Sequence, residues 1–479
     1  MLPVDSLGGD EIPSRHVAAE VTSSSGLSVP KGQRAPFGWK TVTITTADKP
    51  ALTLKWPADT RTPNPTHLRI AVALDERDAK IVEVALADSG RKIGEIDVRF
   101  PAPFQIYQLS VSAPDAADMI REGVALRLAK GSDLEILISG ADLPDTLKPH
   151  LLQPGTTKPL QEFYSRMNSL AVVQQFGWME GCVLDGLIDL SAIAEHQGMK
   201  SMAQRHLSLF FRDDGLVYEN PKSAPNDGRI YGIEGGLPFA ALAKLRPDHP
   251  SLGMTTGFWE ARRRPNGSIQ DGDQMSGEGS YTVAYPMAVV ARQRNDEKMM
   301  QDALYQCRIR QVRFFDGKEF WRTYDDDGKR GNRNWARGIA WQMLGLARTL
   351  EVARERKDIE DLKLQYQKLA LWIISHQRQD GLWSVIVNEP KLEADTSGSA
   401  GIAAALALGA RNGWLDESSR AAAQRTLDGL ERHLSRDGFL DGAAPSNKGG
   451  LELQRSDYRG IFQMGMGLMA QLIAALKSP

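Results

Sequence analysis

Residues 396–415 read TSGSAGIAAALALGARNGWL, a run of alanine, glycine, serine and leucine that carries no charge before Arg411. A helix that is apolar on all sides is buried in a protein interior. Small side chains also let neighbouring helices approach closely, because the side chains at the contact set the distance between the helix axes. This segment therefore predicts a buried helix in a crowded centre of helices.

Five further segments share this character. They read WMEGCVLDGLIDLSAIA at 178–194, EGGLPFAALAKL at 234–245, SYTVAYPMAVVAR at 280–292, WARGIAWQMLGLARTL at 335–350 and RGIFQMGMGLMAQLIAAL at 459–476. Their spacing of about 50 residues fits an array of helical hairpins. Charged, amphipathic helices lie between them, such as 296–315 and 357–377, and another precedes them at 160–174. Six buried helices alternating with six half-exposed ones predict an (α/α)6 barrel over residues 160–479; a plain helical solenoid is the alternative.

The first part of the chain has a different period. Apolar or alternating runs bounded by Pro, Gly, Asp and Asn predict strands at 39–47, 51–56, 67–74, 80–87, 92–100, 105–113 and 133–139. Short strands at this spacing favour a β-sandwich over residues 1–142, and the proline-rich segment 143–159 is expected to be a linker. The fold class is thus a multidomain α+β protein. A packing role is favoured over a carbohydrate-binding module for the first domain, since no aromatic cluster marks a sugar platform.

Composition excludes several classes of function. The 479 residues include 58 basic and 60 acidic side chains, for a net charge of -2, so no electrostatic argument favours nucleic acid or an anionic membrane. No apolar run is long enough to cross a bilayer, and the N-terminus has no signal-peptide core. We expect a cytoplasmic or periplasmic protein; the oligomeric state is open. Cys182 and Cys307 lie in apolar helical patterns and are expected in the core, and no metal or cofactor is expected.

The inner helices of such a barrel run parallel, so the residues at their N-terminal ends face one cavity. At or near these starts stand Trp178, Glu234, Glu278, Trp335, Arg337, Thr396, Ser397, Tyr458 and Arg459. Tryptophan faces stack on sugar rings, and arginine pairs with a carboxylate through two parallel hydrogen bonds. The set predicts a binding site for a uronic acid, whose carboxylate Arg337 or Arg459 would bind. Trp341 is expected to stack on sugar, and Trp383, after an Asp-Gly turn, is expected at the rim.

Two acids on neighbouring inner helices suit the hydrolysis of a glycosidic bond. One carboxyl group must donate a proton while the other activates water or stabilises developing charge. Glycines flank both acids, in GIEGG around Glu234 and GEGS around Glu278. The residues alone leave open which of Glu278 and Glu234 donates the proton. Asp271 and Asp273 are rival acids, and each glutamate could instead only stabilise the start of its helix.

Four segments carry a resemblance to a known family. They are DGLWSVIVNEPKLEADTSGSAGIAAALALGARNGWL at 380–415, WARGIAW at 335–341, QMSGEGSYTVAYPMA at 274–288 and IEGGLPFAALAKL at 233–245. Together they resemble segments of the unsaturated uronyl hydrolases, glycoside hydrolase family 105 and its relative family 88, from about Trp178 to the C-terminus. The resemblance implies that Glu278 is the acid/base and Glu234 its partner, and that Trp335, Arg337 and Trp341 bind sugar.

The resemblance also implies a reaction. These enzymes remove a terminal 4,5-unsaturated uronic acid from an oligosaccharide by protonating the C4=C5 double bond and adding water at C5, without a metal or cofactor. The sequence departs from the family because both acids are Glu instead of Asp, and Ile339 and Ala340 replace Asn and Gly. Arg322, also a candidate for binding substrate, stands where many members have His. A hydrolase of saturated β-glucuronides on the same barrel is therefore the alternative.

Three other classes fit less well. A sugar epimerase would use histidines, but the candidates are expected beside outer helices: His206, His249, His376 and His433. A polysaccharide lyase would need a tyrosine or histidine base, for which Tyr281, Tyr285 and Tyr458 are available. A protein that binds glycans without catalysis is the third.

Overall fold

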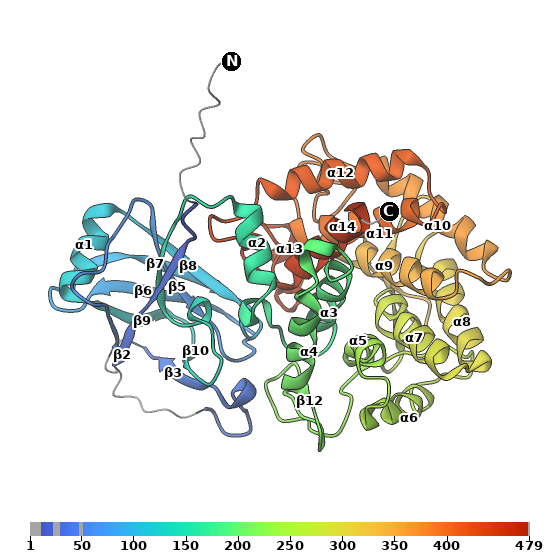
Figure 1. Cartoon of the computed structure of the whole chain (residues 1–479), viewed down its shortest axis with the longest axis horizontal. Helices are drawn as coiled ribbons and strands as arrows, with labels where there is room; N and C mark the ends of the chain where they lie inside the picture. The colour runs from blue at the N-terminus through green and yellow to red at the C-terminus, as the bar shows by residue number, and fades with distance from the viewer. Residues whose placement is uncertain (1–10, 23–28, 47–50, 478–479) are drawn as a thin grey trace, which may run out of the picture.

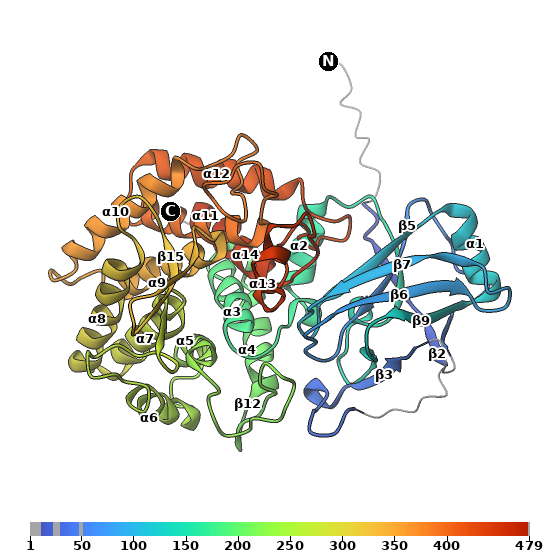
Figure 2. The ribbon, with the colours of Figure 1, turned by 180° about the vertical axis from the view of Figure 1, so that it is seen from behind.

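The structure, a computed structural model, describes residues 11–22, 29–46 and 51–477. Strands gather on one side of the molecule and helices form a ring on the other (Figures 1 and 2). The predicted change from strands to helices along the chain is thus present. Residue 47, the end of one predicted strand, and residues 1–10, where a signal peptide was sought, lie outside the described residues.

Two larger antiparallel sheets make up the strand-rich side. The first has the order β2 (Glu20–Thr22), β4 (Leu52–Lys55), β9 (Val124–Lys130), β6 (Ala79–Leu86), β7 (Lys92–Arg99). The second has the order β1 (Arg15–Ala18), β11 (His150–Gln153), β5 (Thr66–Ala71), β8 (Ile106–Val111), and β3 (Lys40–Ile44) pairs with β10 (Leu134–Ser139). One hydrophobic cluster draws on both larger sheets, with Leu68 from β5 and Val82 from β6 among its members. Alternation of buried residues along β6 is the pattern expected of a strand with one face in a core.

Some elements of this region were not predicted. They are β1, β2, β9, β11 and the helix α1 (Ala113–Glu122). The strand β11 lies inside segment 143–159, which was expected to be a linker. Leu151 and Leu152 of β11 are buried, and the strand pairs with both β1 and β5. The prolines on either side hide this short apolar run in the sequence, and the segment is a structural part of the sheet.

Six helices form a closed inner ring. They are α3 (Trp178–Leu190), α5 (Pro238–Leu245), α7 (Tyr285–Arg294), α9 (Ala336–Val352), α11 (Thr396–Arg411) and α14 (Met464–Lys477). Each packs against the next, and α14 packs against α3. A solenoid would leave its first and last helices apart, so this closure favours the barrel. The helices that alternate with the ring are α2 (Pro159–Met167), α4 (Met199–Phe210), α6 (Met254–Glu260), α8 (Glu297–Phe314), α10 (Glu360–Ile374) and α12 (Glu417–Glu431).

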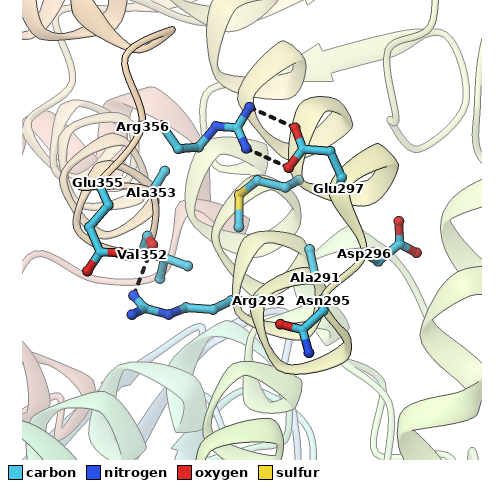
Figure 3. Close-up of a pocket in the computed structure, with 10 residues that line it drawn as sticks. Ala291, Arg292, Asn295, Asp296, Glu297, Val352, Ala353, Glu355 and Arg356 are labelled. Carbon is cyan, nitrogen blue, oxygen red and sulfur yellow. Dashed lines mark hydrogen bonds and ion pairs between the residues drawn. The ribbon is translucent and has the colours of Figure 1, made fainter.

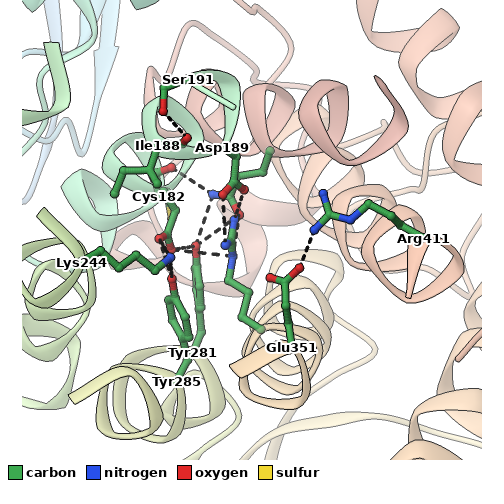
Figure 4. A network of polar contacts seen from close by, with 12 residues as sticks. Cys182, Ile188, Asp189, Ser191, Lys244, Tyr281, Tyr285, Glu351 and Arg411 are labelled. Carbon is green, nitrogen blue, oxygen red and sulfur yellow. Dashed lines mark hydrogen bonds and ion pairs between the residues drawn. The ribbon is translucent and has the colours of Figure 1, made fainter. Parts of the chain in front are cut away.

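The interior of the ring holds a buried polar cluster, which we call the polar centre (Figure 4). It consists of Asp185, Asp189, Lys244, Tyr281, Tyr285, Arg348 and Gln471, from five of the six inner helices and the turn that leads into α7. Arg348 pairs with Asp189 and donates to Gln471 Oε1 at 2.7 Å. Asp185 accepts from the hydroxyls of Tyr281 and Tyr285 at 2.7 and 2.8 Å. The cluster contains two carboxylates and two cations, and their pairing offsets the free-energy cost of burying these charges.

Buried polar contacts join the sheets to the barrel. Asp437 accepts from Arg69 Nη1 at 2.6 Å and contacts His16 Nε2 at 2.8 Å. Burial alone would raise the pKa of Asp437, but Arg69 and His16 outweigh it and hold that pKa well below its usual range. Gln463 Nε2 also donates to the carbonyl of Phe104 at 2.7 Å. A carboxylate buried in this way requires its partners from the other part of the chain, so the two parts stabilise one another.

Two further expectations concern the burial of the cysteines and the absence of a membrane-spanning helix. Cys182 and Cys307 are both buried and unpaired by disulfide, as the apolar patterns around them predicted. Among residues 11–22, 29–46 and 51–477, no helix combines the length and the hydropathy that crossing a membrane requires.

Candidate active site

A cavity of about 160 Å³ opens where inner helices begin. It is lined by six of the candidate residues from the sequence: Trp178, Glu234, Glu278, Trp335, Arg337 and Trp341. The other lining residues are Asp75, Arg77, Gln175, Met179, Pro221, Tyr231, Ser446, Asn447 and Lys448. The structure thus brings both glutamates and three tryptophans to one small cavity.

Glycines allow both acids to reach this position. Glu234 lies in a 3-10 turn, Ile233–Gly236, just before α5, where a Cβ on Gly236 would lie 2.5 Å from the carbonyl oxygen of Thr282. Glu278 precedes the π-helical turn Ser280–Ala284 that leads into α7, and a Cβ on Gly279 would lie 2.2 Å from the Arg310 guanidinium. The glycines let the two turns pack closely. π-Turns of this kind are frequent at functional sites.

The two acids have different electrostatic surroundings. Glu278 Oε1 accepts from Arg322 Nε at 2.7 Å and from Nη2 at 2.6 Å. Burial, and then the charge of Glu278, raise the pKa of Glu234 to about 7, although Arg322 opposes the shift. Glu234 therefore keeps a substantial share of its proton near neutral pH, whereas Glu278 is held by two hydrogen bonds from Arg322. A raised pKa is a property of a proton donor, so Glu234 is a candidate for that role as well as Glu278, to which the resemblance assigns it.

Aromatic rings form part of the cavity wall. The rings of Trp178 and Trp341 meet edge to face, with centroids 5.0 Å apart. Trp341 also stacks on Tyr281, at 6.1 Å and an interplanar angle of 15°. Trp335 donates its indole N–H to Gln454 Oε1 at 3.1 Å. These contacts fix the rings as rigid surfaces against which an apolar sugar face can pack.

Arg337 lines the cavity, but its donors are largely used by the protein. Nη2 donates to the carbonyl of Ala444 at 2.6 Å, and Nε lies 3.4 Å from Asp395 Oδ2. The hydroxyl of Ser397 donates to Asp395 Oδ1 at 2.6 Å. Ser397 was expected to touch substrate; instead it is buried and orients the carboxylate that holds Arg337.

The structure places four other predicted substrate contacts away from this cavity. Trp383 is fully buried, with its indole N–H on the carbonyl of Ile373, because the turn before it folds inward. Thr396 is buried and donates to the carbonyl of Asp441. Tyr458 donates to the carbonyl of Asp97 in β7, and Arg459 donates only to backbone carbonyls. Tyr458 and Arg459 lie away from the cavity because the inner helix α14 begins at Met464 and not at Arg459.

The rival acids lie outside the cavity. Asp271 accepts from the backbone N–H of Ile233 at 2.9 Å and from Arg262 Nε at 2.8 Å, which braces the turn that carries Glu234. Asp273 has a side chain that is 82% exposed and pairs with Arg264. Neither is placed to exchange a proton with a ligand beside Glu278.

Other residues of the cavity were missed. Asp75 and Arg77 come from the loop between β5 and β6, Lys448 comes from the loop before α13 (Gly450–Arg455), and Tyr231 precedes the turn of Glu234. Tyr231 adjoins Glu234 and is buried, and both facts raise the pKa of its hydroxyl well above the usual value. A tyrosine in this state is a poor base. Because polar loop residues carry no period, their sequence offered no signal for the site.

A second cavity, of about 300 Å³, lies between the ends of α7 and α9 and the start of α8 (Figure 3). Both of its arginines are already paired, as Arg356 binds Glu297 at 2.7 Å and Arg292 donates to the carbonyl of Val352 at 3.0 Å. No aromatic ring lines it. Its chemistry does not suit a sugar, so the smaller cavity at the two glutamates is the candidate active site. In the described part of the chain, no group of three or more His, Cys, Asp or Glu could hold a metal ion.

The raised pKa of Glu234 predicts a pH-dependent effect on stability. Between the ordinary value of 4.5 and about 7, the folded protein binds this proton more tightly than the unfolded chain, so the free energy of unfolding falls as the pH rises through this window. Glu234→Gln removes the penalty and should stabilise the protein by about 1–3 kcal/mol near pH 8, but not near pH 4.5. Urea unfolding at both pH values measures this difference. Asp273→Asn, at an exposed acid, is the control; equal effects of Glu234→Gln at both pH values would contradict the raised pKa.

One family model matches the chain. Residues 241–474 match the model described as Glycosyl Hydrolase Family 88. The match includes Glu278, Arg322 and Trp335 but begins after Glu234. No curated protein gives a significant match.

Solved structures share the fold. A possible family 105 member from Salmonella enterica serovar Paratyphi A is 15% identical, with a TM-score of 0.56 over 66% of this chain and 92% of that one. A structure described as a polysaccharide lyase is 17% identical, with a TM-score of 0.52 over 66% and 95%. An unsaturated glucuronyl hydrolase from Bacillus sp. GL1, described as responsible for glycosaminoglycan degradation, is 17% identical, with a TM-score of 0.50 over 67% and 94%.

At these identities the structural likeness shows the fold alone, and the family match covers the region that carries Glu278. Together they confirm the resemblance expected from the four sequence segments. Residues 241–474 match the glycosyl hydrolase family 88 model, and the chain is a glycoside hydrolase that is similar in fold to the unsaturated uronyl hydrolases.

Proposed function

We propose that this enzyme removes a terminal uronic acid from oligosaccharides produced by the breakdown of acidic polysaccharides. The observation that carries the proposal is the pair of glutamates in one tryptophan-walled cavity, one with a pKa of about 7 and the other paired with Arg322. Two carboxyl groups whose pKa values are pushed apart can divide the roles of acid and base between them.

The reaction on an unsaturated uronide follows from these roles. Glu234 delivers its proton to C4 of the C4=C5 double bond, while Glu278 removes a proton from the water whose oxygen bonds to C5. The hemiketal formed at C5 then opens and releases the rest of the oligosaccharide. Trp178 and Trp341 hold the ring, and Arg322 orients the carboxylate of Glu278 through its Nε and Nη2. No metal or cofactor is required for these steps.

Hydrolysis of a saturated β-glucuronide is the second candidate. It is favoured by the ion pair of Glu278 with Arg322, since both residues depart from the pattern of the unsaturated uronyl hydrolases. In that reaction Glu234 would protonate the leaving oxygen and Glu278 would activate water or attack C1. An epimerase is disfavoured because none of the residues lining the cavity is a histidine.

We also propose that the two sheets form a β-sandwich domain that extends beyond residue 142 to include β11, and that the barrel, from residue 160, is the catalytic domain. The shared hydrophobic cluster of the sheets supports the first part, and the closed ring of inner helices supports the second.

One assay separates the candidate reactions. Oligosaccharides made by a lyase carry a conjugated uronate that absorbs ultraviolet light, and intact acidic oligosaccharides do not. We expect the absorbance of the first to fall when the enzyme is added. Release of saturated glucuronate without a change in absorbance would support the second candidate. A rise in absorbance from intact polysaccharide would show a lyase and overturn the proposal, as would the absence of any product from either set.

A further inference from the structure

The strand-rich part of the chain contributes directly to the active-site cavity. Asp75 and Arg77 lie in the loop between β5 and β6, residues 72–78, and both line the cavity that holds Glu234 and Glu278. The family match begins only at residue 241. This wall therefore comes from outside the matched region.

Several contacts hold the loop in place. The side chain of Asp75 is only 3% exposed, and its Oδ1 accepts from Lys448 Nζ at 2.5 Å. Its backbone N–H donates to Ser223 Oγ at 2.7 Å. Arg77 donates from Nε to Asp75 Oδ2 at 3.0 Å and from Nη2 to the carbonyl of Pro221 at 2.7 Å. The Arg77 guanidinium is therefore positioned before any ligand arrives.

The cations of the site differ in how many donors they have left. The ammonium of Lys448 donates to Asp75 Oδ1 and to the carbonyls of Glu76 and Pro101, which uses all three of its hydrogens. Arg337 is held by Asp395 and backbone carbonyls, as described above. Arg322 directs both Nε and Nη2 at Glu278. Lys448 and Arg337 are thus held by the protein itself, and Arg322 pairs with Glu278 and is not among the residues that line the cavity.

Arg77 is different. Its side chain is 52% exposed, and within residues 11–22, 29–46 and 51–477 its Nη1 donates no hydrogen bond. A guanidinium with free donors, fixed in direction by two contacts, suits a planar or tetrahedral anion. The negative charge of Asp75 does not fully neutralise the positive charge of Arg77, because Asp75 also pairs with Lys448.

We propose that Arg77 forms an anion subsite of the active site and binds an acidic substituent, a carboxylate or a sulfate, of the oligosaccharide. This inference rests on the proposed function and deepens it: the residue that selects an acidic substrate comes from the strand-rich part and not from the barrel. The anion can be the carboxylate of the terminal uronic acid or an acidic group on the next sugar.

Binding to a protein that cannot turn over its ligand tests the subsite. In a Glu278→Gln background, we expect Arg77→Ala to weaken the binding of a lyase-generated unsaturated disaccharide about 10- to 100-fold, the loss of one charge-assisted pair. Arg77→Lys should recover part of the affinity. Arg91→Ala is the matched control, because Arg91 is 48% exposed, pairs with Asp115 and Asp118, and lies outside the cavity. Titration calorimetry with the full chain provides the dissociation constants.

Two disaccharides distinguish the sources of the anion. One has a neutral second sugar and the other a sulfated second sugar. An equal loss of affinity for both assigns Arg77 to the terminal carboxylate, and a loss confined to the sulfated ligand assigns it to the next sugar. If Arg77→Ala binds both ligands as tightly as Arg91→Ala does, the subsite is overturned while the proposed function stands. If the Glu278→Gln parent binds neither ligand and the wild type cleaves neither, the proposed function fails and the subsite fails with it.

Discussion

Glu278→Gln is expected to lower the turnover number about 100- to 10,000-fold, the usual contribution of a general acid or base. The amide has the shape of the carboxylate but cannot take a proton from water. The side chains of Arg322 and Glu278 are only 14% and 10% exposed, so loss of their ion pair should also reduce stability, and turnover must be measured well below the unfolding temperature of the variant. Turnover of the preferred oligosaccharide, thermal unfolding and ligand affinity should all be measured on the same preparation.

The partner acid should show a different pH signature. Because Glu234 must carry a proton to act as the donor, kcat/KM of the wild type should fall as the pH rises through about 7. The residual activity of Glu234→Gln should lack this limb, since the amide does not titrate. A wild-type profile that instead rises through pH 7 would assign Glu234 as the base and support the roles that the resemblance implies.

The rival acid supplies the control for both variants. Asp273→Asn removes an exposed carboxylate from the same stretch of chain and should leave turnover unchanged. Retained binding with lost turnover in Glu278→Gln separates an enzyme from a protein that only binds glycans. Full turnover by Glu278→Gln would remove this residue from the mechanism.

Arg348→Met is expected to reduce the free energy of unfolding by about 3–5 kcal/mol, the cost of leaving a buried charge without its partner. The side chain of Arg348 is 1% exposed and donates to Asp189 and Gln471. Its Nε also lies 3.8 Å from Asp185 Oδ2. Its removal leaves two carboxylates in the polar centre with only Lys244 as a cation. Denaturant unfolding at constant pH, followed by circular dichroism, gives the change.

A surface arginine close by provides the comparison (Figure 4). Arg411 pairs with Glu351, and the two side chains are 22% and 30% exposed. Arg411→Met should cost at most about 1 kcal/mol, because exposed ion pairs contribute little. If both variants lose the same stability, the burial of Arg348 in the polar centre contributes no more to stability than an ion pair near the surface.

The sequence predicted the helical ring well because the ring depends on composition and period. Small, apolar helices such as 396–411 must be buried, and their alternation with charged helices decides which lie inside. The same reasoning located Glu234, Glu278 and Trp335, which follow loops at helix starts and are flanked by small residues. It did not predict the rotation of each helix, so Ser397 and Thr396 were expected to face the cavity and instead contact Asp395 and Asp441.

Residues delivered by distant loops could not be found in this way. Arg77 belongs to the polar stretch DERDAK between two strands, and Lys448 to a loop rich in glycine and serine. Neither has a local pattern that differs from an ordinary turn, because its role depends on the packing of one part of the chain against another. The strand β11 was missed for a related reason. Its two leucines form too short an apolar run to predict a strand, and the strand is stabilised by pairing with β1 and β5, which are distant in sequence.

The contact between Asp75 and Lys448 has a consequence for when the enzyme can start to work. A ribosome makes the β5–β6 loop early and the segment that carries Lys448 more than 350 residues later. A nascent chain that already contains both glutamates still lacks three residues of the cavity wall, Ser446, Asn447 and Lys448, and the last inner helix, α14, so we expect it to bind sugar weakly. Unfinished chains therefore should not sequester substrate, and catalytic competence should arise in one late step.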